Sequence, residues 1–308
     1  MPTASILTHI SVQPGNWLYF VPIALLYGTL AFLLYLCGKK GEKWTMGFIE
    51  VMYWVNFAGH ILKQFVPSYM AAWPNGIARS TAENFCALYV LIAPFAFRFF
   101  GKYGKDYLCY MGIYSAILVY FFPTGAIDAG ELDNPGAFFE TGRFYFCHAP
   151  LLFGGVLMLA RGTHRLDYRR VPIVALLIGG AMVVTYLNNL FLNAVLYHYD
   201  WKMVLERNSP EFNSSFQTGP GTWVDPYLSW IYPYLIPGVQ TYYLDGVLHF
   251  TPILYILPFA YPLLLLLGYG LAVPLDFRHI RQDHYARQSK RRLDKLEKEI
   301  LAKEANTI

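Results

Sequence analysis

Seven apolar stretches, each close to the length that crosses a bilayer, constrain this chain more than any other feature. A membrane-spanning helix needs roughly 20 mostly apolar residues. The stretches that qualify are 17–37, 46–65, 79–97, 107–123, 140–160, 171–196 and 250–273. Only 14% of the 308 residues are charged, which is too few to cover the surface of a soluble domain. The sequence therefore predicts an all-α, polytopic bundle of about seven transmembrane helices.

The distribution of basic residues predicts the orientation of this bundle. Nineteen of the 24 Lys and Arg residues fall in the segments 38–45, 98–106, 161–170 and 276–308. The positive-inside rule assigns such segments to the cytoplasm, which places the N-terminus outside and the C-terminus inside. The basic residues of the outer segments are Lys63, Arg79, Arg143, Lys202 and Arg207.

Two segments flank the apolar stretches and are predicted to differ from them. Residues 1–275 form the transmembrane bundle, and its outer loop 198–248 is rich in Trp, Tyr and Pro. Because Trp and Tyr prefer the headgroup level, we expect this loop to fold back over the outer end of the bundle as a lid. Residues 276–308 mix basic and acidic side chains and predict a charged cytoplasmic helix.

Polar side chains at membrane depth are costly, so each is a candidate functional residue. Cys86 lies 12 residues before Arg98, about 18 Å along a helix, and His148 lies 13 residues before Arg161, about 20 Å. Two different predicted spans thus place a thiol and an imidazole at one level in the outer half of the bilayer. His60, Asn188 and Asn189 are expected near the same outer level, as is Asn84, within one turn of Cys86.

A thiol and an imidazole at matched depth suggest a nucleophile and its base. The thiolate is the reactive form of Cys, and a neighbouring imidazole promotes it. Cys147 is the weaker nucleophile candidate, because it points about 100° away from His148 around the helix. The simpler interpretation is that Cys86 is a small buried apolar residue and His148 a hydrogen-bonded core histidine.

Other chemistries remain open from the residues alone. His60 and His148 with nearby Asn or Glu side chains suggest metal binding, but no paired-His spacing supports it and we predict no metal. Cys86 and Cys147 suggest a redox pair, although no CxxC motif occurs. A permease whose helices break near Pro94 or Gly179-Gly180 is also allowed. No cofactor and no nucleic-acid partner are predicted.

Several short motifs resemble the YwaF-like family of integral membrane proteins. They are Glu83-Asn84-Phe85-Cys86-Ala87-Leu88, Gly112 to Pro123, Phe144-Tyr145-Phe146-Cys147-His148-Ala149-Pro150, Tyr186-Leu187-Asn188-Asn189 with Asn193, and the aromatic-proline segment 223–237. The family often has a His two residues before the Cys, where this chain has Asn84. Mammalian relatives of that family are described as Cys/His-dependent phospholipid acyltransferases. The resemblance therefore implies that Cys86 is a nucleophile and His148 its base.

The leading hypothesis is an integral membrane acyl-transfer enzyme that acts on glycerophospholipids in the outer half of the bilayer. Cys86 and His148 are its predicted catalytic residues. Asn84, Asn188, Asn189 and His60 are predicted to bind substrate or the developing oxyanion. The alternative is a non-catalytic permease, or an assembly protein that binds lipid. Membrane lipids are the expected partners in both cases, and either protein is compatible with a homo- or hetero-oligomer in the membrane.

Overall fold

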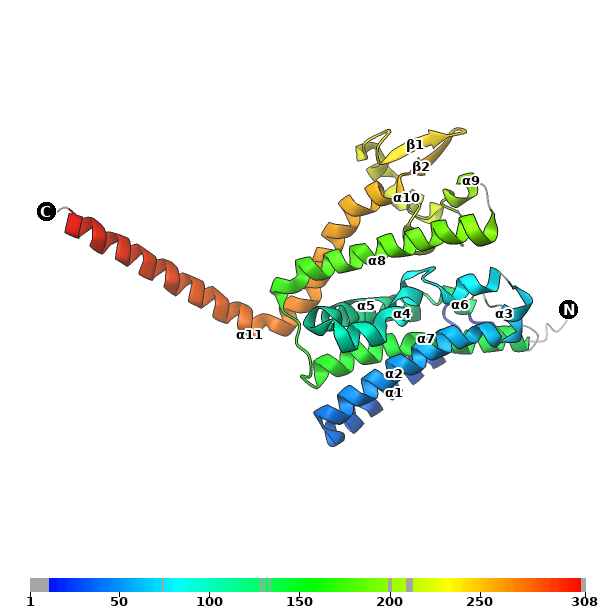
Figure 1. The fold of residues 1–308 in the computed structure, drawn as a ribbon, viewed down its shortest axis with the longest axis horizontal. Coiled ribbons are helices and arrows are strands. Elements are labelled where there is room, and N and C mark those ends of the chain that lie inside the picture. The colour runs from blue at the N-terminus through cyan, green and yellow to red at the C-terminus, as the bar shows by residue number, and fades with distance from the viewer. Residues whose placement is uncertain are drawn as a thin grey trace, which may run out of the picture.

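The computed structural model describes residues 11–73, 75–127, 129, 131–132, 134–198, 201–208 and 213–305. Within these residues, seven helices of at least 15 residues dominate the fold (Figure 1). They are α1 (Trp17–Lys40), α2 (Glu42–Leu62), α4 (Phe85–Phe99), α5 (Gly101–Phe121), α7 (Pro135–Ala160), α8 (Val171–Leu192) and α11 (Pro252–Ala305). The shorter helices are α3 (Pro67–Ala71), α6 (Thr124–Ile127), α9 (Trp201–Val204) and α10 (Asp225–Leu228). The all-α prediction is confirmed.

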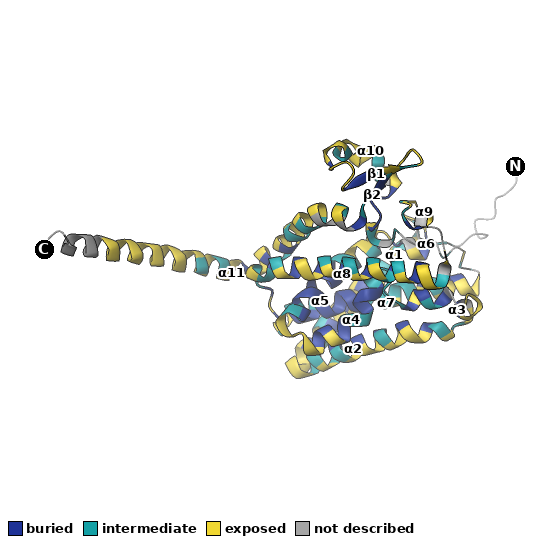
Figure 2. Cartoon of the chain, turned by 45° about the horizontal axis from the view of Figure 1, so that its top comes forward, coloured by how far each residue is buried: buried dark blue, intermediate teal, exposed yellow. Residues whose placement is uncertain are grey.

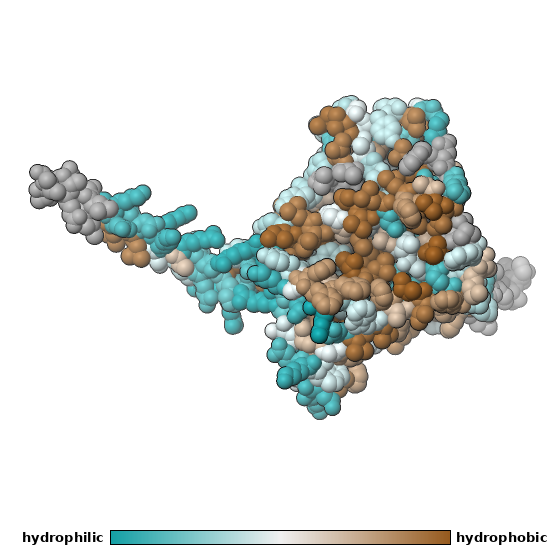
Figure 3. Space-filling model, in the orientation of Figure 1, coloured by the Kyte–Doolittle hydropathy of each residue, from teal (hydrophilic) through white to brown (hydrophobic). Residues whose placement is uncertain are grey.

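The long helices coincide with the apolar stretches of the sequence. Among the described residues, four stretches are long and apolar enough to cross a membrane: Trp17–Lys40, Pro135–Ala160, Tyr168–Leu196 and Pro258–Lys298. Many large apolar side chains on these helices face outward, including Leu25, Phe32, Leu176 and Leu266. Figure 3 shows apolar residues spread over the bundle, while the described part of α11 that projects from it is mainly hydrophilic. Such extensive apolar exposure is typical of a lipid-facing surface, so the chain is an integral membrane protein.

The core lies where α4, α5 and α7 meet (Figure 2). Two glycines allow α5 and α7 to approach closely. A Cβ added at Gly112 would lie 2.2 Å from the Leu151 carbonyl oxygen, and one at Gly155 would lie 3.2 Å from the Cys109 Cα. Small residues at helix contacts are the usual means of close packing in membrane bundles. These contacts fix α7, and therefore His148, against the centre of the bundle.

Two element boundaries differ from the predicted ones. The stretch expected to begin at residue 79 contains a 3-10 turn (Asn75–Ser80), and α4 starts only at Phe85. The reason is Asn84, whose side-chain oxygen accepts a hydrogen bond from the Ala87 backbone N–H at 2.8 Å and caps the helix. The charged helix expected from residue 276 is the continuation of α11, which runs unbroken from Pro252 to Ala305. Residues 306–308 lie outside the described part of the chain.

The connecting segment, residues 198–248, departs from a purely helical fold. It ends in an antiparallel hairpin, β1 (Thr241–Leu244) and β2 (Val247–Phe250), with Thr241 opposite Phe250. Asp245 and Gly246 form the turn with φ of 53° and 78°. Two positive φ angles match the type I′ turn that Asp-Gly favours. Figure 1 shows the hairpin and α10 above α8 and the start of α11.

The connecting segment also contacts the first turn of α4. Ser215 Oγ accepts a hydrogen bond from the Phe85 backbone N–H at 3.3 Å. Gln217, which is fully buried, accepts a second from Asn189 Nδ2 at 2.9 Å. The side chains of Trp201 and Trp223, which contributed to the lid prediction, lie outside the described residues. The described contacts bring this segment next to the residue that precedes Cys86.

A network of charged side chains joins the helix ends at the opposite side of the bundle. Asp106 on α5 is 1% exposed. It accepts a hydrogen bond from His164 Nε2 at 2.7 Å and two from the Arg170 guanidinium. Arg165 pairs with the buried Asp276 of α11. This network connects α5, the α7–α8 turn and α11 through two buried carboxylates, Asp106 and Asp276.

Candidate thiol–imidazole site

Cys86 lies in the first turn of α4, directly after the Asn84 cap. Asn84 has extended backbone angles (φ −145°, ψ 172°), as an N-cap residue requires. Cys86 is partly buried and packs against the apolar core. Its position is set by the cap, because the helix begins one residue before it.

His148 lies near the middle of α7 and is 7% exposed. Its Nδ1 atom lies 2.6 Å from the Phe144 carbonyl oxygen, one turn earlier on the same helix. A carbonyl only accepts hydrogen bonds, so Nδ1 carries the proton. Nε2 is therefore the ring nitrogen of the neutral imidazole that can accept one. Such a backbone bond is a common way to fix the orientation and tautomer of a histidine.

Two thiols approach this imidazole from different helices. The Cys86 thiol lies within electrostatic range of His148. Cys147 Sγ lies 3.4 Å from His148 Nδ1 and 3.3 Å from the Phe144 carbonyl oxygen. The structure thus brings Cys86 and His148 together, and it places Cys147 in the same group. All four cysteines of the chain are free thiols, so Cys86 and Cys147 are not joined by a disulfide.

Tyr107 is a hydroxyl donor near Cys86 that the sequence analysis did not single out. It is 4% exposed and is in electrostatic contact with Cys86. Its hydroxyl is buried and has no hydrogen-bond partner among the described residues. Tyr107 lies in an aromatic pair with Tyr89, with ring centroids 6.3 Å apart. In the sequence it is one of 25 tyrosines, and no local motif distinguishes it.

The asparagines predicted to bind an oxyanion have other partners. Asn188 Nδ2 donates to Thr81 Oγ1 at 3.0 Å, and Asn189 Nδ2 donates to the Glu83 carbonyl at 3.1 Å and to Gln217. Both amides hold α8 against the segment that precedes α4. Asn84 uses its side-chain oxygen as the helix cap and keeps its amide nitrogen as a donor.

His60 is buried near the end of α2 and is in electrostatic contact with His148. Around it lies a group of charged and polar side chains, of which the sequence pattern assigned two, Lys63 and Arg143, to outer segments. Lys63 follows His60 by one helical turn, and its Nζ lies 3.4 Å from His60 Nδ1. Arg143 and Glu140 of α7 face it across Tyr69. We call Lys63, Tyr69, Glu140 and Arg143 the basic cluster.

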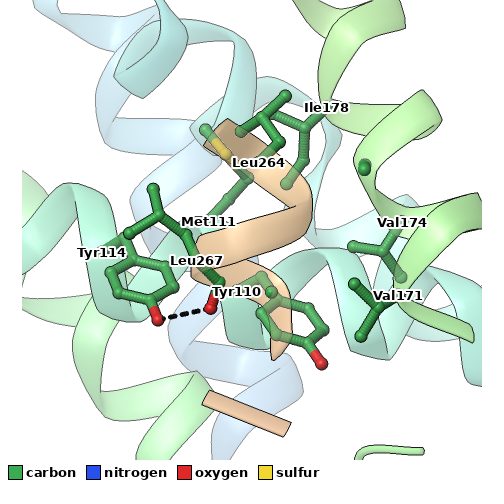
Figure 4. Close-up of a pocket in the computed structure, with 10 residues that line it drawn as sticks. Tyr110, Met111, Tyr114, Val171, Val174, Ile178, Leu264 and Leu267 are labelled. Carbon is green, nitrogen blue, oxygen red and sulfur yellow. Dashed lines mark hydrogen bonds between the residues drawn. The ribbon is translucent and has the colours of Figure 1, made fainter. Parts of the chain in front are cut away.

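Two cavities lie away from the thiols. A groove of about 750 Å³ between α1, α2 and α7 is lined mainly by apolar side chains and contains Asn56, Tyr145 and Ala149. His148 precedes Ala149 by one residue, about 100° around the helix, and it does not line the groove. A smaller cavity of about 50 Å³ lies between α5, α8 and α11. Figure 4 shows its lining, which is mainly apolar, with Tyr114 bonded to the Leu267 carbonyl at 2.7 Å.

Helices interrupted at a midplane site would have favoured a permease. Instead α4 continues through Pro94, and α8 continues through Gly179 and Gly180. The fold and the site together define a mainly helical integral membrane protein with thiols grouped around a buried imidazole.

A comparison with known families places this protein more closely. The TMEM164 family matches residues 9–243, and the chain therefore belongs to the TMEM164 family. This match does not test the resemblance to the YwaF-like family, and it does not show an acyltransferase activity. No curated protein and no solved structure matches the chain.

Proposed function

We propose that this protein is a membrane acyl-transfer enzyme that acts on glycerophospholipids through Cys86 and His148. The observation that carries the proposal is the interaction between the Cys86 thiol and the buried imidazole of His148. The two residues are 62 positions apart in the sequence and lie on different helices, α4 and α7. The proposed bundle has seven spans, an outer N-terminus and a cytoplasmic C-terminus, so the reaction takes place in the outer half of the bilayer.

The proposed reaction has two steps, acylation of Cys86 and transfer of the acyl group to an acceptor. His148 Nε2 accepts the thiol proton, and the Cys86 thiolate attacks an ester carbonyl carbon of the lipid. The carbon–oxygen ester bond breaks, the glycerol oxygen takes the proton from the imidazolium, and the acyl group remains as a thioester on Cys86. A lysolipid hydroxyl then attacks this thioester while His148 accepts its proton. The imidazolium finally returns the proton to the departing Cys86 sulfur.

Cys86, rather than Cys147, is the proposed nucleophile because of the hydrogen bonds around His148. Cys147 lies on the Nδ1 side of the ring, where the Phe144 carbonyl already holds the proton. A base must offer an unprotonated nitrogen to the nucleophile. Cys147 therefore lacks the acceptor that activation requires, while Nε2 remains available for a thiol from another helix.

A covalent intermediate provides the direct test of this function. Incubation of the purified protein with a glycerophospholipid is expected to add one acyl group to Cys86, as measured by mass spectrometry of the intact chain and its peptides. Cys147→Ser is the matched control and is expected to retain the adduct. An adduct confined to Cys147 would contradict the assignment of the nucleophile.

The alternative is a non-catalytic permease or lipid-binding assembly protein. The observation that favours it is the large apolar groove between α1, α2 and α7, which the Cys86–His148 pair does not line. Lipid that co-purifies in this groove, with no acyl adduct on any cysteine during incubation, would support this second function over the first.

Tyr107 is the proposed hydrogen-bond donor to the oxyanion. Its buried hydroxyl has no hydrogen-bond partner among the described residues and lies within electrostatic range of Cys86, so it is proposed to donate to the developing negative charge. Loss of one such donor typically lowers kcat by about 10²–10³-fold. Tyr107→Phe is therefore expected to lower kcat, measured at saturating lipid, by this factor. The KM for the lipid should change little. Tyr110→Phe, another buried hydroxyl on α5, is the control and should retain activity.

A further inference from the structure

Lys63 is a nearly buried cation that directly follows α2. It is 6% exposed, and its Nζ lies 3.4 Å from His60 Nδ1. An ammonium group only donates, so His60 Nδ1 accepts. Two carboxylates, Glu83 and Glu140, attract the Lys63 charge. Each of them is already paired with an arginine. A buried charge is costly unless it is paired, which indicates that an anion completes this site.

Tyr69 separates Lys63 from a second cation. Lys63 Nζ lies 5.6 Å from the centroid of the Tyr69 ring, and Arg143 Cζ lies 5.8 Å from the same centroid. The Tyr69 hydroxyl donates to Glu140 Oε2 at 3.0 Å, which fixes the ring. The two cations are thus held beside one aromatic ring by residues of η1 (Lys63–Phe65), α3 and α7.

Glu140 accounts for only one of these two positive charges. Arg143 Nε and Nη2 lie 2.9 and 2.7 Å from Glu140 Oε2. Glu83, the second carboxylate that attracts Lys63, is paired in turn with Arg79 at 3.9 Å. Three cations thus face two carboxylates, which leaves one positive charge in excess around Lys63. The side chains of Arg143 and Glu140 each remain 26% exposed, so the cluster is open to the surface on the α7 side.

The basic cluster is also close to the thiol–imidazole site. Lys63 and Arg143 are both in electrostatic contact with Cys147. Arg143 precedes His148 by five residues, about 7.5 Å along the axis of α7. In a glycerophospholipid the phosphate and the ester carbonyls are separated by the short glycerol backbone. The spacing between cluster and imidazole therefore suits a lipid whose phosphate and ester occupy both sites at once.

We propose that Lys63, with Arg143 beside it, binds the phosphate of a glycerophospholipid. The phosphate site is inferred from the geometry of the basic cluster. The further statement that the lipid ester then lies at Cys86 and His148 rests on the function proposed above. The cluster selects phosphate-bearing lipids over neutral glycerolipids of the same acyl chain. A lysine supplies such a contact as a compact charge, and an adjacent arginine adds directional donors.

The test measures binding without turnover. The full chain carrying Cys86→Ala, in uncharged detergent, is titrated with lysophosphatidylcholine, with monoacylglycerol of the same acyl chain, and with inorganic phosphate. Because Lys63→Gln removes a charge-assisted hydrogen bond to the phosphate, it is expected to weaken lysophosphatidylcholine binding on the order of 10- to 100-fold. Monoacylglycerol binding is expected to remain unchanged. Lys102→Gln, an exposed lysine near the start of α5, is the matched control. The double variant Glu140→Gln/Arg143→Gln provides a second probe if Lys63→Gln does not fold.

Three results would overturn the phosphate site. The first is equal binding of the two lipids by the parent protein. The second is an equal loss for both lipids in Lys63→Gln, which would indicate a general packing defect. The third is Lys63-dependent binding of inorganic phosphate alone, without lipid selectivity, which would indicate a free-phosphate site. Phosphate-selective binding without any acyl adduct on Cys86 would retain this inference and remove the proposed reaction.

Discussion

His148→Ala is expected to lower kcat by roughly 10²–10⁴-fold, the usual contribution of a positioned general base. The substitution removes the imidazole that interacts with the Cys86 thiol. The proposed acceptor of the thiol proton is then lost, and a protonated thiol is a poor nucleophile. The rate at which a membrane-permeant maleimide alkylates Cys86 is expected to fall in parallel.

His249→Ala is the matched control for this experiment. His249 is also buried, at 5% exposure, and its Nδ1 also bonds to a backbone carbonyl, that of Leu205 at 3.1 Å. It lies in the hairpin of the connecting segment, so its loss should leave the alkylation rate of Cys86 unchanged. If Cys86 reacts no faster than the buried Cys109, or at the same rate after His148→Ala, His148 is a packing residue and Cys86 is a small apolar one.

Asp106→Ala is expected to produce the largest loss of stability. Asp106 accepts hydrogen bonds from both His164 and Arg170, whose side chains are only 7% and 15% exposed. Removal of one partner of a buried ion pair costs about 3–5 kcal/mol, because the remaining charge is left without a partner. We expect a loss at the lower end of this range, since water reaches part of Arg170. Thermal unfolding in detergent is the measurement.

Asp167→Ala is the control for Asp106→Ala, because it also removes a carboxylate that pairs with Arg170 but that is less buried. Asp167 also pairs with Arg170, at 3.3 Å, but its side chain is 32% exposed. Partly exposed pairs contribute about 1 kcal/mol or less. Equal losses in the two variants would show that the burial of Asp106 adds nothing to the stability of the helix ends.

The positions of the helices follow from the sequence because they depend on local composition. An apolar run of about twenty residues satisfies its backbone polar groups internally as a helix, whatever its neighbours are. The same local logic predicts one depth for Cys86 and His148, since each residue adds 1.5 Å along the axis. The Asp245-Gly246 turn of the hairpin carries a comparably local signal, although the all-α interpretation passed over it.

Tertiary structure decided which side chains at that depth meet. Depth fixes one coordinate, whereas helix rotation and neighbours depend on contacts between distant segments, such as Gly112 against Leu151. Those contacts turn His148 towards Cys86 and Cys147 and leave the apolar groove on another part of α7. They also bring Lys63 and Arg143 to one tyrosine ring, 80 residues apart in the chain. No local pattern encodes such a pairing, because its energy exists only once the helices have packed.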